Sequence, residues 1–331
     1  MKNLLANKNY LLLLFGNFIS RIGSSLYNIA ISWWIVNEFG SPKSIAFIYA
    51  AFSTGNLITM PISGVISDKY SKKAIMVITD FFSGIICIIV SYFVWVKFVK
   101  ISLYVLASFL LGMLSGMFKP ASKALTPLVL RKEEILKGNS LFNNLGEAAK
   151  IIGPGIASIF FAFSGDIYFL IMINGISYVL SAFSEVLIRI QTKRINNSEL
   201  GFWKSMQEGI RYTIGHKVIG VSILCISFVN FFLTSYDVLI TVFISKCLNG
   251  NEQIYSNIVL ISAIGALACT LLIVFFNIKL SLNWLCFSIT SIGISIIIFA
   301  LNTIIFLAYV IVFFVGATQV LFNTLFYSYI Q

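Results

Sequence analysis

The sequence has few charged residues and almost no histidine. Only 11% of its 331 residues are charged, against about a quarter in a typical soluble domain, and His216 is its single histidine. A lone histidine excludes a metal site built from several histidines and leaves no Ser–His or Cys–His catalytic set. The five cysteines show no paired spacing, and no Gly-x-x-x-x-Gly-Lys-(Ser/Thr) segment is present. We therefore expect no enzyme, no cofactor and no ATP-driven chemistry.

Apolar residues fill most of the chain. They make up 59% of it, and the mean hydropathy is +0.95, more than the core of a water-soluble protein can absorb. A helix needs about 20 apolar residues to cross a bilayer and satisfies its own backbone hydrogen bonds there. We expect an all-α integral membrane bundle of ten transmembrane helices, at residues 10–36, 44–66, 74–96, 101–118, 141–163, 167–188, 218–245, 254–276, 282–300 and 303–327.

Basic residues set the predicted orientation. If the N-terminus is cytoplasmic, most Lys and Arg residues fall on the cytoplasmic side, including Lys119 after the fourth span. The outer side then receives only Lys43, Lys97, Lys100 and Lys246. This bias follows the positive-inside rule and predicts that both termini are cytoplasmic. It also accounts for the net charge of +11 without a nucleic-acid partner.

One long connection divides the chain. Residues 1–190 hold six predicted spans, residues 191–216 form a cytoplasmic linker, and residues 217–331 hold four spans. Within the linker, Trp203, Met206 and Ile210 share one face of a predicted amphipathic helix on the membrane surface.

The stretch "GVISDKYSKK" lies in the short connection between the second and third spans. Asp68 and Lys72 are four residues apart and are expected to pair along one helical turn. An ordinary positive-inside loop would explain the lysines, but it explains neither Asp68 nor Gly64.

This stretch resembles the loop signature of the major facilitator superfamily, although Ser71 stands where that family usually has glycine. The resemblance implies a membrane transporter that works without a cofactor, binds a small-molecule substrate and is a monomer in the bacterial cytoplasmic membrane. It also implies a cytoplasmic gate, to which we assign Asp80 and the motif residues Gly64, Asp68, Lys69, Lys72 and Lys73.

The segments "NYLLLLFGNFISRIGSSLYNIAISWW" and "GFWKSMQEGIRY" are similar to the macrolide-efflux-like drug exporters of that family. Family members usually have twelve spans arranged as two repeats of six, so the last two spans are expected to be missing here. In the family, the loop aspartate contacts the eleventh helix, and Asp68 is therefore expected to lack that partner.

Two spans carry polar residues at helical spacing. Asn17, Arg21, Ser24, Asn28 and Ser32 form one stripe, and Ser227, Asn230, Thr234, Asp237 and Thr241 form the other. The cost of burying charge in lipid favours placing Arg21 and Asp237 against protein or water. The family resemblance places both spans at the central cavity.

We assign substrate binding to Asn17, Arg21, Asn28, Asn230 and Thr234, and proton coupling to Asp237. Two alternatives stay open. Arg21 is equally consistent with a structural hydrogen-bond hub between helices, and Asp237 is close enough to the outer end of its span to remain solvated.

Three further charged groups receive local interpretations. Asp80 is predicted to latch onto a basic residue of the fourth–fifth connection, such as Arg131. Glu147 and Lys150 are predicted to form a local ion pair, as are Glu185 and Arg189 at the membrane interface.

The sequence thus predicts a proton-coupled secondary transporter that exports an amphipathic, drug-like molecule by alternating access. The alternative is a truncated, transport-inactive membrane protein that at most binds a ligand or a partner helix. Both hypotheses place the chain in a lipid bilayer.

Overall fold

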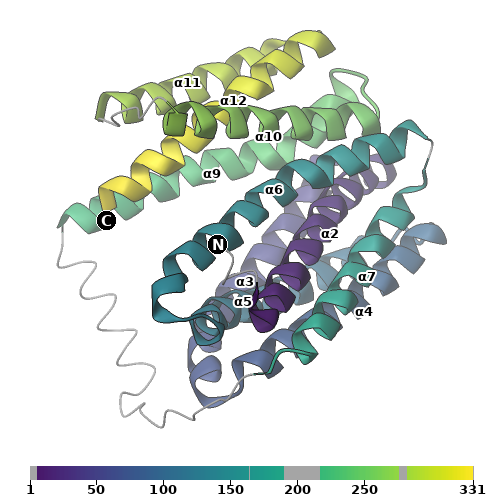
Figure 1. The fold of residues 1–331 in the computed structure, drawn as a ribbon. Coiled ribbons are helices and arrows are strands. Elements are labelled where there is room, and N and C mark those ends of the chain that lie inside the picture. The colour runs from purple at the N-terminus through teal and green to yellow at the C-terminus, as the bar shows by residue number, and fades with distance from the viewer. Residues whose placement is uncertain (1–5, 164, 190–216, 276–281, 331) are drawn as a thin grey trace. The chain divides into compact units, whose positions relative to one another are not determined.

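Helices form all the regular structure in the described part of the chain. The computed structural model describes residues 6–163, 165–189, 217–275 and 282–330 (Figure 1). The helices are α2 (Lys8–Phe39), α3 (Pro42–Lys69), α4 (Lys72–Trp95), α5 (Ile101–Val129), the 3₁₀ turn η1 (Lys132–Glu134), α6 (Ile135–Ala162), α7 (Ile167–Val186), α9 (Lys217–Lys246), α10 (Glu252–Phe275), α11 (Leu282–Leu301) and α12 (Ile305–Ile330).

Each of the ten predicted spans coincides with one long helix, so the prediction of an all-α, multi-pass membrane bundle is confirmed. Nine of these helices are long and apolar enough, within the described residues, to cross a membrane. The tenth, α2, is long enough, but Arg21 and the asparagines of its polar stripe lower its mean hydropathy. The cytoplasmic location of the termini remains a prediction.

The fourth span ends later than the sequence predicted. Its helix, α5, continues past Phe118 to Val129, although Pro120 and Pro127 lie inside it. Neighbouring helices and local backbone adjustments allow proline in membrane helices. The extension places Lys119 within a helix instead of in a loop, which corrects the sequence prediction.

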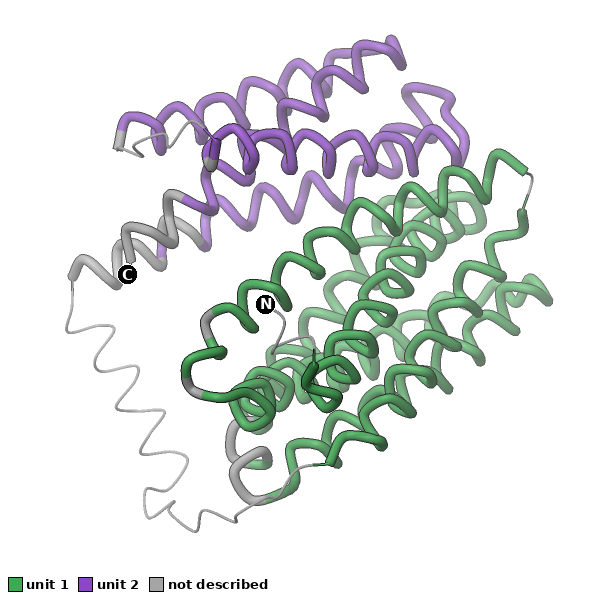
Figure 2. The backbone as a smooth tube through the Cα atoms, viewed as in Figure 1, with its two compact units in different colours: residues 1–198 green, residues 199–331 purple. Residues whose placement is uncertain are grey.

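The chain divides into two compact units, residues 1–198 and residues 199–331 (Figure 2). The predicted linker at residues 191–216 lies outside the described residues, and its amphipathic helix remains a prediction.

Unit 1 is built around α2 and α7. α2 packs against α6 and α7, α4 packs against α5 and α7, and α3 packs against α5. One end of the unit is closed by an apolar cluster from α2, α4 and α5, joined by Ile188: Tyr10, Leu13, Leu14, Ile75, Met76, Ala121, Leu125, Val129, Leu130 and Ile188. This packing holds the polar face of α2 toward α5 and α7.

Unit 2 repeats part of this arrangement. α10 packs against α12 as α3 packs against α5, and α11 packs against α12 as α4 packs against α5. The same detail recurs at both close contacts. Gly55 and Gly112 lie against backbone atoms of the opposite helix, and so do Gly265 and Gly316. A Cβ atom at any of these positions would collide with the facing backbone, so both helix pairs depend on glycine.

Within the described residues, unit 2 has no counterpart of α6 or of α7. In unit 1, α7 packs against both α2 and α4, whereas α9 and α11, their equivalents by chain order, line an apolar groove. Only a small cluster of Leu233, Ile292 and Phe322 joins α9 to α11 and α12 in a buried core.

Candidate functional site

A polar cavity of about 320 Å³ lies inside unit 1. Three residues predicted to bind substrate line it: Asn17, Arg21 and Asn28, all on α2. The rest of the lining comes from α2, α3, α4, α5 and α7: Ser20, Ser24, Tyr27, Phe52, Asp80, Ser83, Ser108, Leu111, Leu114, Ser115, Phe118, Lys119, Asn174 and Tyr178. The structure therefore brings the predicted stripe of α2 together with polar groups from three other helices.

Arg21 is held in a fixed orientation in this cavity. Its Nε donates a hydrogen bond to Asn17 Oδ1 at 2.6 Å, and its guanidinium carbon lies 5.2 Å from the centre of the Phe142 ring. Gly146 of α6 leaves the space that the guanidinium occupies, because a Cβ there would collide with it. Arg21 forms no ion pair among the described residues. The half-buried cation is thus oriented without a direct salt bridge, although Glu147 of α6 acts on it electrostatically, and it can meet a polar or anionic group of a ligand.

Residues of α5 and α7 complete the cavity, and sequence reasoning did not select them. Tyr178 shares a hydrogen bond of 3.0 Å with Ser24, and the buried Asn174 donates to Cys87 Sγ at 3.3 Å. Lys119 adds a second cation to the lining. The sequence did contain a pattern that could have identified the polar face of the sixth span. Its polar residues recur at steps of three or four, at Asn174, Ser177, Ser181 and Ser184.

Asp80 also lines this cavity and is only 2% exposed. It forms no ion pair in the described part of the chain, and Arg131 uses its backbone N–H to bind Glu134. The predicted Arg131 partner is therefore not found at Asp80. The assignment of Asp80 to the gate remains a prediction.

The predicted gating loop consists of two residues, Tyr70 and Ser71, between α3 and α4. Ser71 caps α4 by accepting the backbone N–H of Ala74, which gives a local reason for serine where the family usually has glycine. Lys73 Nζ donates to the carbonyl oxygens of Val186 (2.6 Å) and Ile188 (2.7 Å), at the end of α7. Lys72 begins α4. The side chains of Asp68 and Lys69 lie outside the described residues, so the Asp68–Lys72 pair stays a prediction, as does the gating role of Gly64.

The two local ion pairs predicted from sequence have different outcomes. Lys150 Nζ lies 2.8 Å from Glu147 Oε1, and both side chains are largely exposed, so that prediction is confirmed. The Glu185–Arg189 prediction is wrong. Glu185 is buried and neither of its carboxylate oxygens has a hydrogen-bond partner among the described residues, whereas Arg189 is exposed. The spacing of four residues between Glu185 and Arg189 suggested a pair, but it could not show that α2 and α4 pack against α7 and bury Glu185.

Most of the polar stripe of α9 is exposed in unit 2. Asn230, Thr234 and Asp237 are all exposed, and none of them lines the apolar groove between α9 and α11. Thr241 ends the stripe in a buried position. The structure does not bring these residues into a pocket of their own unit, and their substrate and proton roles remain predictions.

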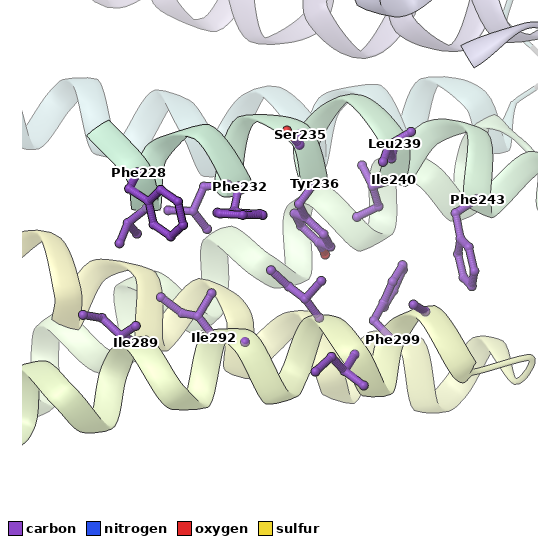
Figure 3. A pocket seen from close by; sticks show the side chains of 16 residues that line it. Phe228, Phe232, Ser235, Tyr236, Leu239, Ile240, Phe243, Ile289, Ile292 and Phe299 are labelled. Atoms are coloured by element: carbon purple, nitrogen blue, oxygen red, sulfur yellow. The ribbon is translucent and has the colours of Figure 1, made fainter. Parts of the chain in front are cut away.

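The apolar groove has a volume of about 640 Å³. Figure 3 shows Phe232, Tyr236 and Phe243 of α9 pointing toward the side of α11 that carries Ile292 and Phe299. Apart from Ser235 and Tyr236, its lining side chains are hydrocarbon. The groove offers apolar contact area and few polar groups that would orient a ligand.

The described ranges contain no cluster of three or more His, Cys, Asp or Glu side chains that could hold a metal ion.

Comparison with known proteins gives consistent matches. The sequence model described as Major Facilitator Superfamily matches residues 13–331. Macrolide efflux protein A of Streptococcus pyogenes is 22% identical over 204 residues, which cover 59% of this chain and 48% of that protein. The uncharacterized MFS-type transporter YvqJ of Bacillus subtilis strain 168 is 22% identical over 333 residues, or 98% of this chain and 78% of YvqJ. The chain spans about half the length of the macrolide efflux proteins it matches.

The fold has solved counterparts. A bacterial homologue of the iron transporter ferroportin, in its inward-facing state, superposes with a TM-score of 0.73 at 17% identity. The superposition covers 97% of this chain and 83% of that structure. At this identity the likeness concerns the fold alone.

Proposed function

Because the chain belongs to the Major Facilitator Superfamily, we propose that it is a secondary active transporter that exports an amphipathic, drug-like small molecule in exchange for protons. The observation that carries the proposal is the cavity of unit 1, where an oriented cation without a salt-bridge partner lies within a bundle of apolar helices. Charged groups within a membrane are costly and mark substrate or ion pathways. The similarity to macrolide efflux protein A supports a drug-like substrate.

In this proposal, Arg21 binds the polar end of the substrate, and Asn17 fixes the orientation of the guanidinium. Asn28 offers an exposed amide on the same stripe, while Phe52 and Phe118 offer apolar contacts within the cavity. A mixed lining of this kind suits a molecule with both apolar and polar parts.

The second polar stripe contributes the remaining roles. Asn230 and Thr234 bind substrate, and Asp237 takes up the coupling proton. Their exposure on α9 supports access by substrate and by water.

Transport proceeds by alternating access, in which the two halves of the bundle rock about the substrate. The gate comprises Asp80 and the motif residues Gly64, Asp68, Lys69, Lys72 and Lys73. The bonds from Lys73 to the end of α7 support this role, because they tie the start of α4 to a second helix of unit 1. We place the protein in the bacterial cytoplasmic membrane as a monomer.

The alternative function is a membrane protein that binds a ligand or a partner helix without transporting anything. The apolar groove between α9 and α11 favours it, because both helices expose large hydrocarbon side chains there.

Accumulation of radiolabelled erythromycin, a macrolide, in bacterial cells separates the two functions. We expect cells that express the chain to accumulate less erythromycin than cells with the empty vector, and a protonophore to abolish the difference. Arg21→Ala should accumulate as much as the vector, while the matched control Lys43→Ala, at an exposed lysine, should behave like the wild type. Accumulation in wild-type cells equal to that in vector cells, with the protein inserted, would favour the second function.

A further inference from the structure

Two carboxyl groups are buried together where α4 packs against α7 in unit 1. Asp80 of α4 is 2% exposed, Glu185 of α7 is 1% exposed, and the two interact electrostatically. They differ in their access to the polar cavity, because Asp80 lines it and Glu185 does not. The pair therefore consists of an inner carboxyl group and an outer one.

Glu185 has no compensating partner among the described residues, and Asp80 has only the hydroxyl group of Ser181 beside it. Both oxygens of Glu185 and Oδ2 of Asp80 lack hydrogen-bond partners, and neither residue forms an ion pair there. Ser181 lies one turn before Glu185, and its hydroxyl group interacts with the carboxyl group of Asp80. Both carboxyl groups are therefore buried where the same two helices pack, without a cation paired to either of them among the described residues.

The surrounding charges do not neutralise the pair. Arg21 donates to Asn17, and Lys73 donates to the carbonyl oxygens that end α7. In the described part of the chain, the charged or titratable groups around the pair include Arg21 of α2, Lys119 of α5, Lys73 of α4 and Tyr178 of α7, which lies near Asp80. Of these, Arg21, Lys119 and Tyr178 line the cavity that Asp80 reaches.

Electrostatics limits the charge that this position can hold. Burying a carboxylate without a partner costs several kcal/mol, and a second carboxylate beside it adds repulsion. Two carboxyl groups that share a site therefore hold at least one proton at a pH where isolated carboxyl groups are ionised.

We propose that Asp80 and Glu185 form a proton-carrying pair that holds one proton and exchanges it with the polar cavity through Asp80. This inference rests on the proposed proton-coupled transport and adds a proton site to Asp237. Glu185 gives its proton to the Asp80 carboxylate, and the Asp80 carboxyl group then gives that proton to a water molecule in the cavity. The pair changes from one negative charge to two, and the cations Arg21 and Lys119 in the cavity lining reduce the cost of the second charge.

Infrared spectroscopy of the purified full-length chain tests the pair directly, since a protonated carboxyl group has a carbonyl stretching band that a carboxylate lacks. In an Asp237→Asn background, which removes the other proposed proton site, we expect this band at neutral pH and its loss when Asp80→Asn and Glu185→Gln are added. The matched control is Asp166→Asn, at the exposed N-cap of α7, which should keep the band. Amides of the same shape preserve the packing, and the single variant Glu185→Gln replaces the double variant if the latter does not elute as a folded protein.

The outcomes are distinct. Absence of the band in the Asp237→Asn background, or its retention in the folded amide variant, overturns the inference. Loss of the band when sodium chloride replaces choline chloride also overturns it, because the site would then take a metal cation. A band that behaves as expected in a protein that transports nothing supports the proton pair and contradicts the proposed function. Proton-coupled transport by a protein without the band supports the proposed function and contradicts the proton pair.

Discussion

The glycine contacts that recur in the two units predict a large stability difference between two chemically identical substitutions in unit 2. A Cβ atom at Gly316 of α12 would lie under 3.0 Å from backbone atoms of Ser262 on α10. Backbone cannot rotate away as a side chain can, so Gly316→Ala must push α10 and α12 apart. At Gly293 of α11, by contrast, a Cβ atom meets nothing within 4 Å.

The magnitude follows from comparing the two variants. Replacing glycine by alanine within a helix gains about 0.5–1 kcal/mol through backbone entropy, and this gain is common to both positions. Overpacking a close contact costs about 1–3 kcal/mol, and this cost falls on Gly316→Ala alone. The unfolding equilibrium constants of the two variants should therefore differ by about fivefold to 150-fold.

Denaturation of the purified chain in detergent by increasing SDS, followed by circular dichroism, measures this difference. We expect Gly293→Ala to unfold at the wild-type SDS fraction or above it, and Gly316→Ala to unfold well below it. Gly112→Ala should destabilise unit 1 in the same way, because Gly112 lies against the backbone of Phe52. Equal midpoints for Gly316→Ala and Gly293→Ala would refute the close packing of α10 and α12.

Two further substitutions test contacts that position the helices of unit 1. Tyr10→Phe removes the buried hydroxyl that donates to the Gly138 carbonyl at 2.6 Å, and should lower the free energy of unfolding by about 0.5–1.5 kcal/mol. Tyr70→Phe, at a tyrosine 68% exposed, should leave it unchanged, and equal effects in the same SDS titration would argue against the α2–α6 bond. Lys73→Met removes a cation from the C-terminus of α7 and should cost about 1 kcal/mol, with faster amide hydrogen exchange in the last turn of α7. Exchange as slow as in the control Lys43→Met would contradict that contact.

Helical spacing predicted the parts of the site that lie on a single helix. The stripe of Asn17, Arg21 and Asn28 could be found because residues three or four apart lie on the same side of a helix. Exposing a charged side chain to lipid costs free energy, so this side was expected to meet protein or water. The same reasoning found the polar stripe of α9. It also located the ends of most helices within a few residues, because long apolar runs leave little choice of structure in a bilayer.

Contacts between helices that are distant in sequence could not be predicted in this way. Lys119 and Pro120 resembled the end of a span, but α5 continues past them, so Lys119 reaches the cavity. Glu185 had a basic residue one turn away, yet it is buried, and the carboxyl group with which it interacts is Asp80 of α4. In both cases the decisive partner lies on another helix, and a single sequence does not identify it.

The central claim, that Arg21 lies in the substrate path of a proton-coupled exporter, is tested most directly in proteoliposomes. Purified wild-type and Arg21→Ala protein would be reconstituted at equal density, and uptake of radiolabelled erythromycin would be followed after an imposed pH gradient. The account predicts that wild-type vesicles concentrate erythromycin while the gradient lasts and that Arg21→Ala vesicles match empty vesicles. Concentration by both proteins to the same level would contradict the role of Arg21, and uptake by neither above empty vesicles would contradict transport itself.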